Sequence, residues 1–454
     1  MFNKNFIKEN LAVGFMLFAL FLGAGNIIFP PVLGQQAGEH FIISIIGFLI
    51  TGVGLPLVAI IAVAKNGGDL QVLSNRVSPI FGILFTAIVY LSIGPFFAIP
   101  RTGAVSFEIG VLPFLSGTQA DSWIPLFITT FIFFGITLYL AFNPTKLVDR
   151  IGKILTPALL IVIALLGIKA FVTPMGEFGE AQGKYIQHAF SESFIQGYLT
   201  MDVLGALIFG IVIVQALKAR GIEDKAKQVK VSIFAGIVAA IGLSFVYICL
   251  SYIGASSVSA IGVLDNGGQI LSASAEILYG GFGSIILSAT IILACLTTSV
   301  GLLSANASFF ERVLPIMSYR GYLIVFTIFS FAISNIGLTQ LLNITLPVLL
   351  AIYPIAIVLM IVSLIAGKFG HAPIVYILPL AVTTLVAIND GLNQAGWTID
   401  AYNDFLLNVL PLQAQSLGWL IPAIVAFIIG AIISKLGGQG AANSQPKTPW
   451  KSQM

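Results

Sequence analysis

Charged side chains are scarce in this sequence: Asp, Glu, Lys and Arg together account for 9% of its 454 residues. A soluble domain carries roughly 25%. Hydrophobic residues make up 58% of the chain. A chain with so little charge cannot cover a surface that faces water, so we expect membrane lipids to surround most of it.

Cysteine and histidine are also rare, and their scarcity excludes several classes of protein. The two cysteines, Cys249 and Cys295, lie inside apolar runs, so neither a disulfide framework nor a cysteine-based zinc site is expected. The net charge of +3 is too small to indicate a nucleic-acid partner. A membrane-embedded enzyme stays a distant alternative, because the sequence contains no HExxH, GxSxG or cysteine cluster. We expect no resident cofactor.

Apolar runs long enough to cross a membrane occur along the whole chain. A helix needs about 20 apolar residues to cross the hydrocarbon core of a bilayer. The sequence therefore predicts an all-α membrane protein with about twelve transmembrane helices. The predicted spans are 11–33, 41–64, 79–113, 122–142, 149–172, 196–218, 229–254, 282–311, 320–337, 343–366, 373–389 and 416–435.

The loops between these spans alternate in charge. Of the 21 basic residues, 18 fall on the side of the N-terminus, and the exceptions are Arg101, Lys169 and Lys184. The opposite loops carry mainly acids. This alternation predicts a multi-pass membrane protein with both termini in the cytoplasm. Trp123, Trp397 and Trp419 fall near outer span ends, where tryptophan anchors a helix at the interface.

The two ends of the chain need separate interpretations. Lys4 and Lys8 precede the apolar run 11–22, a pattern that also describes a cleaved signal peptide. Removing that run would break the charge alternation, so we expect it to remain as the first span. The polar stretch 437–454 contains Gly, Ser and Pro and predicts a disordered cytoplasmic tail, leaving 1–436 as the polytopic transmembrane domain.

Two of the predicted spans contain residues that disfavour a continuous helix. The first span includes Gly23, Gly25 and Asn26 at membrane depth. The sixth span combines spaced glycines with Thr200 and Asp202. Irregular backbone survives in a membrane only where it lines a cavity, because lipid cannot satisfy its polar groups. An unwound first helix would expose carbonyls on one side and N–H groups on the other.

The five-span distance between these breaks predicts an internal repeat. Two five-helix repeats of inverted topology, at about 11–172 and 196–366, would bring their broken first helices together at a shared midplane site. Two extra helices would follow in 373–436. The alternative is that the glycines serve only for close packing between helices.

Three sequence motifs resemble those of a known family. The Gly23–Pro31 segment resembles the first-helix motif of the leucine-transporter fold, and Ala294–Ser299 resembles the eighth-helix sodium motif of that fold. Together with Gly23–Pro31, the segment Pro100–Glu108 is similar to the bacterial branched-chain amino acid:cation symporter family. This resemblance covers nearly the whole chain. It implies a secondary transporter that moves a branched-chain amino acid together with a cation.

A sodium site is expected where neutral oxygen atoms gather, because a carboxylate would be left uncompensated after the ion is released. Thr297 and Thr298 supply hydroxyl groups, and the Ala294 carbonyl lies one helical turn earlier. The resemblance implies two further carbonyl ligands, those of Ala19 and Leu22. The alternative is that these threonines only hydrogen-bond their own helix, as threonine often does.

A site for an amino acid must accommodate two charged groups and a side chain. The N–H groups of Gly23, Ala24, Gly25 and Asn26 are candidates for the carboxylate, since a helix N-terminus attracts anions. Freed carbonyls, Thr200 or Asp202 are candidates for the amino group. The remaining wall is apolar and comprises Phe96, Phe97, Phe209 and Leu302. Such a wall suits leucine, isoleucine and valine, with modest discrimination among them.

Three charged residues fall inside predicted spans: Arg101, Glu108 and Asp202. Intramembrane charges are costly and therefore candidates for function, here for gating or coupling. Arg101 and Glu108 lie about 10 Å apart along a helix, too far for direct contact, so we expect Arg101 to pair with Asp202. A purely structural ion pair is the alternative. Proton coupling through Glu108 or Asp202 is the alternative to sodium coupling.

Overall fold

A computed structural model describes residues 4–116, 122–142, 144–369 and 372–436 of the chain. In those ranges every regular element is a helix, as the composition predicts. The predicted tail 437–454 lies outside the described residues.

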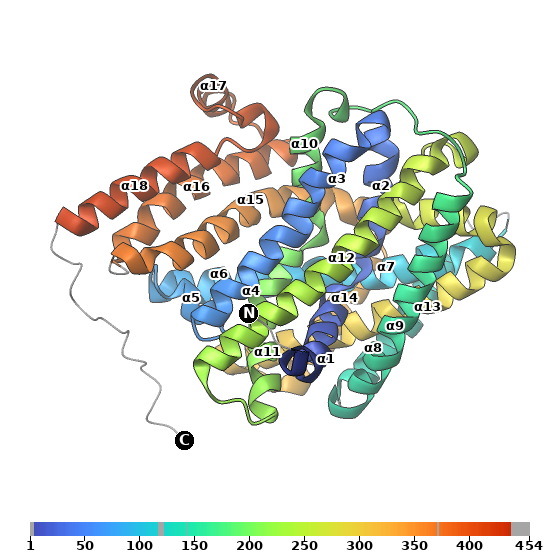
Figure 1. The fold of residues 1–454 in the computed structure, drawn as a ribbon, viewed down its shortest axis with the longest axis horizontal. Helices are drawn as coiled ribbons and strands as arrows, with labels where there is room; N and C mark the ends of the chain where they lie inside the picture. Colours follow the sequence, from blue (N-terminus) through green and yellow to red (C-terminus); the bar gives the residue numbers. More distant parts are fainter. Residues whose placement is uncertain (1–3, 117–121, 143, 370–371, 437–454) are drawn as a thin grey trace.

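Each predicted span coincides with a helix or a set of consecutive helices (Figure 1). In chain order these are α1 (Lys4–Phe21) and α2 (Ala24–Ala37); α3 (Phe41–Leu49) and α4 (Leu55–Lys65); α6 (Pro79–Leu91) and α7 (Ala98–Gly110); α8 (Trp123–Ala141); α9 (Pro144–Val172); α10 (Tyr185–Gln196) and α11 (Asp202–Ala219); α12 (Lys225–Ile261); α13 (Gly267–Val313); α14 (Tyr319–Ser334); α15 (Leu338–Ile365); α16 (Pro373–Gln394); and α18 (Leu420–Leu436).

Length and composition support a membrane location for these helices. Among the described residues, 8 helical stretches are long and apolar enough to cross a membrane. Shorter apolar helices at Pro157–Val172, Tyr319–Ser334 and Leu420–Leu436 join them. The stretch Ala24–Lys65 combines half of the first predicted span with the whole second span. This merger and the three shorter helices explain why fewer long stretches than predicted spans are found.

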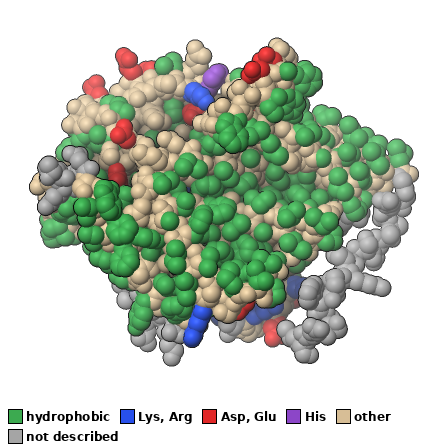
Figure 2. Space-filling view, turned by 180° about the vertical axis from the view of Figure 1, so that it is seen from behind, with side chains coloured by type: hydrophobic (Ala, Val, Ile, Leu, Met, Phe, Trp, Pro, Cys, Tyr) green, Lys and Arg blue, Asp and Glu red, His purple; other side chains and the backbone are tan. Residues whose placement is uncertain are grey.

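The outer surface matches a lipid environment. Figure 2 shows hydrophobic side chains covering the middle of one face, with acidic groups mostly at one end and basic groups mostly at the other. Trp123 and Trp397 are 70% and 73% exposed, as interfacial anchors should be. The prediction for Trp419 was wrong: its side chain is only 3% exposed, so it packs inside the protein and does not face the interface.

Close contact between backbones holds the centre of the bundle together. Helix α2 packs along α12, and a Cβ atom at Gly34 would collide with the carbonyl oxygen of Ser251. Likewise a Cβ at Gly254 would collide with the Pro31 carbonyl. Small residues allow membrane helices to approach this closely. The second half of the first span is therefore fixed against α12.

The predicted breaks in the first and sixth spans are confirmed. Helix α1 ends at Phe21 and α2 begins at Ala24. In the sixth span, α10 passes through a 3-10 turn at Gly197–Thr200 and α11 begins at Asp202. Continuous helices in both spans would have removed the predicted site.

The structure also contains helix irregularities that the sequence analysis did not predict. The third span has a π-helical stretch at Ser92–Phe96, with Gly94 outside helical geometry at φ −93° and ψ −124°. Helix α13 begins well before predicted span 282–311 and bends at Gly280, where φ is +65°. A further helix, α17 (Asp400–Val409), lies between the last two spans.

Candidate substrate and ion site

The break in the first span leaves backbone carbonyls without their helical partners. The Gly23 N–H donates to the Asn26 Oδ1 atom at 3.0 Å instead of continuing the helix to the Ala19 carbonyl. Among the described residues, no backbone N–H donates to the carbonyls of Ala19 or Leu22. Both predicted carbonyl ligands are therefore free to bind a cation or a donor group.

The N-terminus of α2 presents free N–H groups on the other side of the break. Within the described part of the chain, the backbone N–H groups of Ala24, Gly25 and Asn26 have no backbone acceptor. The first turn of a helix leaves such donors unpaired and carries a partial positive charge. This end of α2 is thus suited to a carboxylate.

Asn26 connects the two broken helices. Its Nδ2 group donates to Asp202 Oδ1 at 2.8 Å and to Oδ2 at 2.9 Å. The hydroxyl of Tyr247, on α12, also donates to the Asp202 carboxylate and lies 2.5 Å from Asn26 Nδ2. Asn26 and Asp202 are 2% and 3% exposed, so these hydrogen bonds lie in the protein interior.

The break in the sixth span depends on an unusual backbone conformation at Met201. Its φ of 62° and ψ of 17° place a non-glycine residue in the left-handed region, which is costly and often associated with function. The Thr200 hydroxyl turns back to the Gly197 carbonyl at 2.9 Å. The Val203 N–H donates to the Tyr353 hydroxyl at 3.3 Å. Side chains thus replace the helical hydrogen bonds that the break removes.

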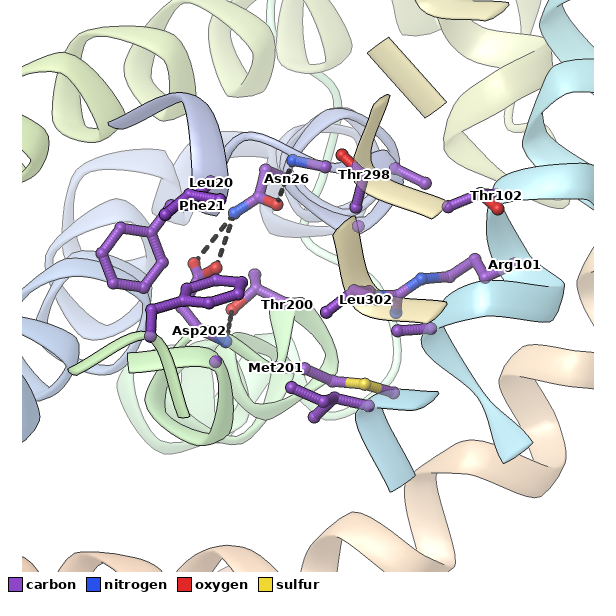
Figure 3. Close-up of a pocket in the computed structure, with 17 residues that line it drawn as sticks. Leu20, Phe21, Asn26, Arg101, Thr102, Thr200, Met201, Asp202, Thr298 and Leu302 are labelled. Atoms are coloured by element: carbon purple, nitrogen blue, oxygen red, sulfur yellow. Dashed lines mark hydrogen bonds between the residues drawn. The ribbon is translucent and has the colours of Figure 1, made fainter. Parts of the chain in front are cut away.

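Both breaks open into one pocket, which also contacts the third and eighth spans (Figure 3). Of the predicted site residues, the pocket is lined by Gly23, Ala24, Gly25, Asn26, Arg101, Thr200, Asp202, Phe209, Thr298 and Leu302. It is also lined by Leu20, Phe21, Ile93, Ala98, Thr102, Met201 and Gly205. Phe97 is buried but does not line this pocket; Ile93 and Ala98 take its place, because the third span breaks next to it.

Arg101 does not pair with Asp202 as predicted. Its Nη1 group donates to the Leu199 carbonyl at 2.6 Å, and its guanidinium lies over the Phe29 ring at 5.2 Å from the centroid. Within the described residues no carboxylate lies within 4.0 Å of Arg101. Figure 3 shows Arg101 and Asp202 entering the pocket from opposite sides.

Glu108 lies outside the pocket and has amide partners. Its Oε1 atom accepts from Asn266 Nδ2 at 2.7 Å and from Gln269 Nε2 at 2.9 Å. Asn266 also caps α13 by accepting from the Gly268 N–H at 2.9 Å. Glu108 therefore joins the end of α7 to the start of α13, and its predicted role in gating stays a prediction.

The predicted sodium ligands of the eighth span differ in their surroundings. Thr298 lines the pocket, and its Cγ2 and Oγ1 atoms lie 3.2 Å and 3.6 Å from the position a Gly23 Cβ would take. Among the described residues, no hydrogen bond of its hydroxyl is found. Thr297 instead donates to the Ala294 carbonyl at 2.9 Å, the alternative considered above. Neither Thr297 nor Ala294 lines the pocket.

Sequence reasoning missed two tyrosines that complete the site, Tyr247 and Tyr353. Each lies in an otherwise apolar helix, and tyrosine is common in membrane proteins. A buried hydroxyl needs a partner, so both were candidates in principle. Their partners lie in other spans, however, and no local pattern identifies them.

Comparisons with known proteins give a consistent assignment. Residues 6–437 match the profile of a family described as branched-chain amino acid transport protein. The permease BraB of Bacillus subtilis is 46% identical over 428 residues, covering 94% of this chain and 96% of that protein. The branched-chain amino acid transport system 2 carrier protein of Pseudomonas aeruginosa is 47% identical over 432 residues, covering 94% and 97%. Escherichia coli BrnQ is 41% identical over 440 residues, covering 96% and 98%.

Solved structures with the same fold are also transporters. Mhp1, a nucleobase-cation-symport-1 family transporter in a closed conformation, superposes with a TM-score of 0.60 at 14% identity, covering 94% of this chain and 91% of that one. MhsT in complex with L-phenylalanine gives a TM-score of 0.52 at 16% identity, covering 93% and 98%. These likenesses confirm the predicted leucine-transporter fold. The chain belongs to the branched-chain amino acid transport protein family and is a transporter, not an enzyme.

Proposed function

We propose that this protein is a sodium-coupled symporter that imports leucine, isoleucine and valine across the bacterial plasma membrane. The observation that carries this proposal is the meeting of two broken helices at one pocket. The break in the first span supplies free N–H groups on α2 and free carbonyls at its other side. The break in the sixth span supplies a buried carboxylate, Asp202. An amino acid and a monovalent cation together match this set of groups.

The substrate's two charged groups have separate partners in the proposed complex. The α-carboxylate lies at the first turn of α2, where the N–H groups of Ala24, Gly25 and Asn26 are unpaired. The α-amino group lies toward Thr200 and Asp202. The relatives in Bacillus subtilis and Pseudomonas aeruginosa are named as a branched-chain amino acid permease and a branched-chain amino acid carrier protein, which supports this class of substrate.

The side chain of the substrate would contact the apolar part of the pocket. Aliphatic and aromatic groups form that part: Leu20, Phe21, Ile93, Phe209 and Leu302. Phe21 comes from the broken first span and Phe209 from the broken sixth span, and their rings meet edge to face with centroids 5.8 Å apart. A pocket of this kind distinguishes side chains that differ by one methylene by only about 1–3 kcal/mol. All three branched-chain amino acids should therefore be accepted.

The sodium ion would bind between the first and eighth spans. The carbonyls of Ala19 and Leu22 lack backbone partners among the described residues, and the unpartnered Thr298 hydroxyl lies beside Gly23. The Thr297 hydroxyl and the Ala294 carbonyl complete the proposed ligand set. The Thr297 hydroxyl donates to the Ala294 carbonyl at 2.9 Å, and the hydroxyl oxygen keeps its lone pairs for an ion.

Alternating access would follow from movement of one helix bundle against the other around the fixed site, as inverted repeats at 11–172 and 196–366 allow. The distribution of basic residues supports cytoplasmic termini. With this orientation, the inward sodium gradient would drive import of the amino acid.

Uptake of labelled leucine into proteoliposomes tests this proposal. An inward sodium gradient should drive accumulation, and replacement of sodium by choline at constant pH should abolish it. Thr298→Val should raise the sodium concentration needed for half-maximal uptake. Thr290→Val is the matched control on the same helix, because the Thr290 hydroxyl donates to its own helix at Ile286, 2.7 Å away. Equal sodium dependence in both variants would reject Thr298 as a ligand.

Proton coupling is a second candidate, favoured by the surroundings of Asp202. This buried carboxylate accepts hydrogen bonds from the neutral groups of Asn26 and Tyr247, and no cationic side chain of the described residues lies within 4.0 Å. A proton could therefore neutralise it. Uptake in choline that follows an imposed pH gradient would support this candidate over sodium coupling.

A further inference from the structure

Arg101 is a buried cation that the contacts described above do not neutralise. Its side chain is 4% exposed. It makes a single hydrogen bond, from Nη1 to the Leu199 carbonyl at 2.6 Å, and its Nε atom has no partner among the described residues. A guanidinium has five N–H donors in a fixed planar arrangement. Most of this donor capacity is therefore unused.

A buried charge without an opposite charge is costly inside a membrane. The Phe29 ring, 5.2 Å from Arg101 Cζ, compensates part of this cost through its electron-rich face. One carbonyl and one ring do not replace the hydration of a cation. The position of Arg101 is best explained if an anion joins it during the transport cycle.

The guanidinium lies directly against the first turn of α2. A Cβ atom at Gly25 would be 2.5 Å from Arg101 Nη2 and 2.9 Å from Cζ, so only glycine permits this approach. The unpaired N–H groups of Ala24, Gly25 and Asn26 are in that same turn. Two sets of positively polarised donors therefore converge on one part of the pocket, and they repel each other unless an anion lies between them.

Building on the proposed function, we propose that Arg101 binds the α-carboxylate of the substrate together with the first turn of α2. Arginine recognises carboxylates well because two parallel N–H groups can bond both oxygens. Asp202 lines the opposite side of the pocket and is available to the α-ammonium group (Figure 3). The pocket thereby selects zwitterions and rejects amines or acids that carry only one of the two charges.

The separation of Arg101 and Asp202 is what makes this selection possible. If the two side chains formed an ion pair, the pocket would hold a closed neutral contact and a substrate would have to break it. Instead Arg101 bonds to Leu199, while Asp202 bonds to Asn26 and Tyr247. Each charge is held in place by neutral groups and remains open to a ligand of opposite sign.

Competition binding on the full-length purified protein tests this proposal. L-Leucine, L-leucinamide and 4-methylpentanoate compete with labelled leucine in saturating sodium. They share one side chain, but leucinamide lacks the carboxylate and 4-methylpentanoate lacks the amino group. The wild-type protein should bind leucine far more tightly than either analogue.

The Arg101→Gln variant should weaken leucine binding about ten- to hundredfold, the value of one or two charged hydrogen bonds, and leave leucinamide binding unchanged. The preference for leucine over leucinamide should therefore collapse. The Asp202→Asn variant should instead lose the preference for leucine over 4-methylpentanoate. Arg220→Gln is the matched control, because Arg220 is exposed at the end of α11 and far from the pocket. It should retain both preferences.

A purely structural role for Arg101 gives a different result. The affinities of the Arg101→Gln variant for leucine and for leucinamide would then fall by the same factor, and the proposal would be overturned. If Arg101→Gln does not fold, the Gly25→Ala variant tests the proposal instead. Its methyl group displaces the guanidinium and should reduce the preference for leucine over leucinamide. An unchanged preference in that variant would also overturn the proposal. Wild-type protein that binds none of the three compounds would instead reject the proposed substrate class. Sodium-independent leucine binding would reject only the coupling ion.

Discussion

Replacing Asn26 with alanine should disconnect the two broken helices. The Asn26 side chain donates to both oxygens of Asp202 at 2.8 and 2.9 Å, lies 2.5 Å from the Tyr247 hydroxyl, and accepts from the Gly23 N–H at 3.0 Å. Alanine removes all of these contacts at once. The Gly23 N–H would then lose its only acceptor among the described residues, and Asp202 would keep Tyr247 as its remaining donor.

The magnitude follows from the chemistry of these bonds. A hydrogen bond to a charged group is worth about 1.5–3 kcal/mol, and a buried group left without its partner costs a further 1–3 kcal/mol. We therefore expect Asn26→Ala to destabilise the protein by about 3–5 kcal/mol. Asn10→Ala is the matched control. Asn10 is also a buried asparagine and lies in α1, but it donates only to its own helix, at Phe6. Its loss should cost about 1 kcal/mol.

Thermal unfolding in detergent and leucine uptake in proteoliposomes measure these effects together. Asn26→Ala should lower the unfolding temperature much more than Asn10→Ala and should abolish uptake. Combining Asn26→Ala with Tyr247→Phe should cost less than the sum of the two single changes, because both act on one network. Strictly additive effects, or normal uptake by Asn26→Ala, would refute the argument that Asn26 connects the two breaks.

Three further predictions concern other parts of the molecule. Gly34→Leu should prevent assembly, since a side chain there would collide with the Ser251 carbonyl, and expression of folded protein would measure this. Phe209→Ala should weaken leucine binding by about 1–3 kcal/mol more than alanine binding, which competition assays would detect; equal losses would place Phe209 outside the side-chain site. Glu108→Gln should weaken the link to Asn266 and lower the unfolding temperature while leaving leucine affinity in place, because Glu108 does not line the pocket; a large loss of affinity would contradict this.

Local sequence patterns were sufficient to predict the membrane-spanning helices and the breaks in the first and sixth spans. Apolar runs near 20 residues identify spans because lipid permits little else. Gly23 and Gly25 next to Asn26 mark a weak point in a helix for reasons of backbone chemistry alone. The break in the third span was missed, although the Gly94-Pro95 pair is a recognised break signal. That omission explains why Phe97 was wrongly assigned to the pocket wall.

Tertiary contacts were not predictable in the same way. The hydroxyls of Tyr247 and Tyr353 reach the sixth-span break from α12 and α15, far away in the sequence. The expected Arg101–Asp202 pair was inferred from charge alone. Charge indicates which residues need partners, but the backbone geometry of the break decides which partners they find.

The unwound sixth span explains why Arg101 and Asp202 stay apart. In a continuous helix the Leu199 carbonyl would accept from the Val203 N–H. Because the chain turns at Met201, Val203 donates to Tyr353 instead, and the Leu199 carbonyl is free to accept from Arg101. The same turn places Asp202 at the start of α11, within reach of Asn26. Because of this one local unwinding, a carbonyl holds the Arg101 guanidinium, and amide and hydroxyl donors hold the Asp202 carboxylate. It keeps two opposite charges available in one pocket for a ligand that carries both.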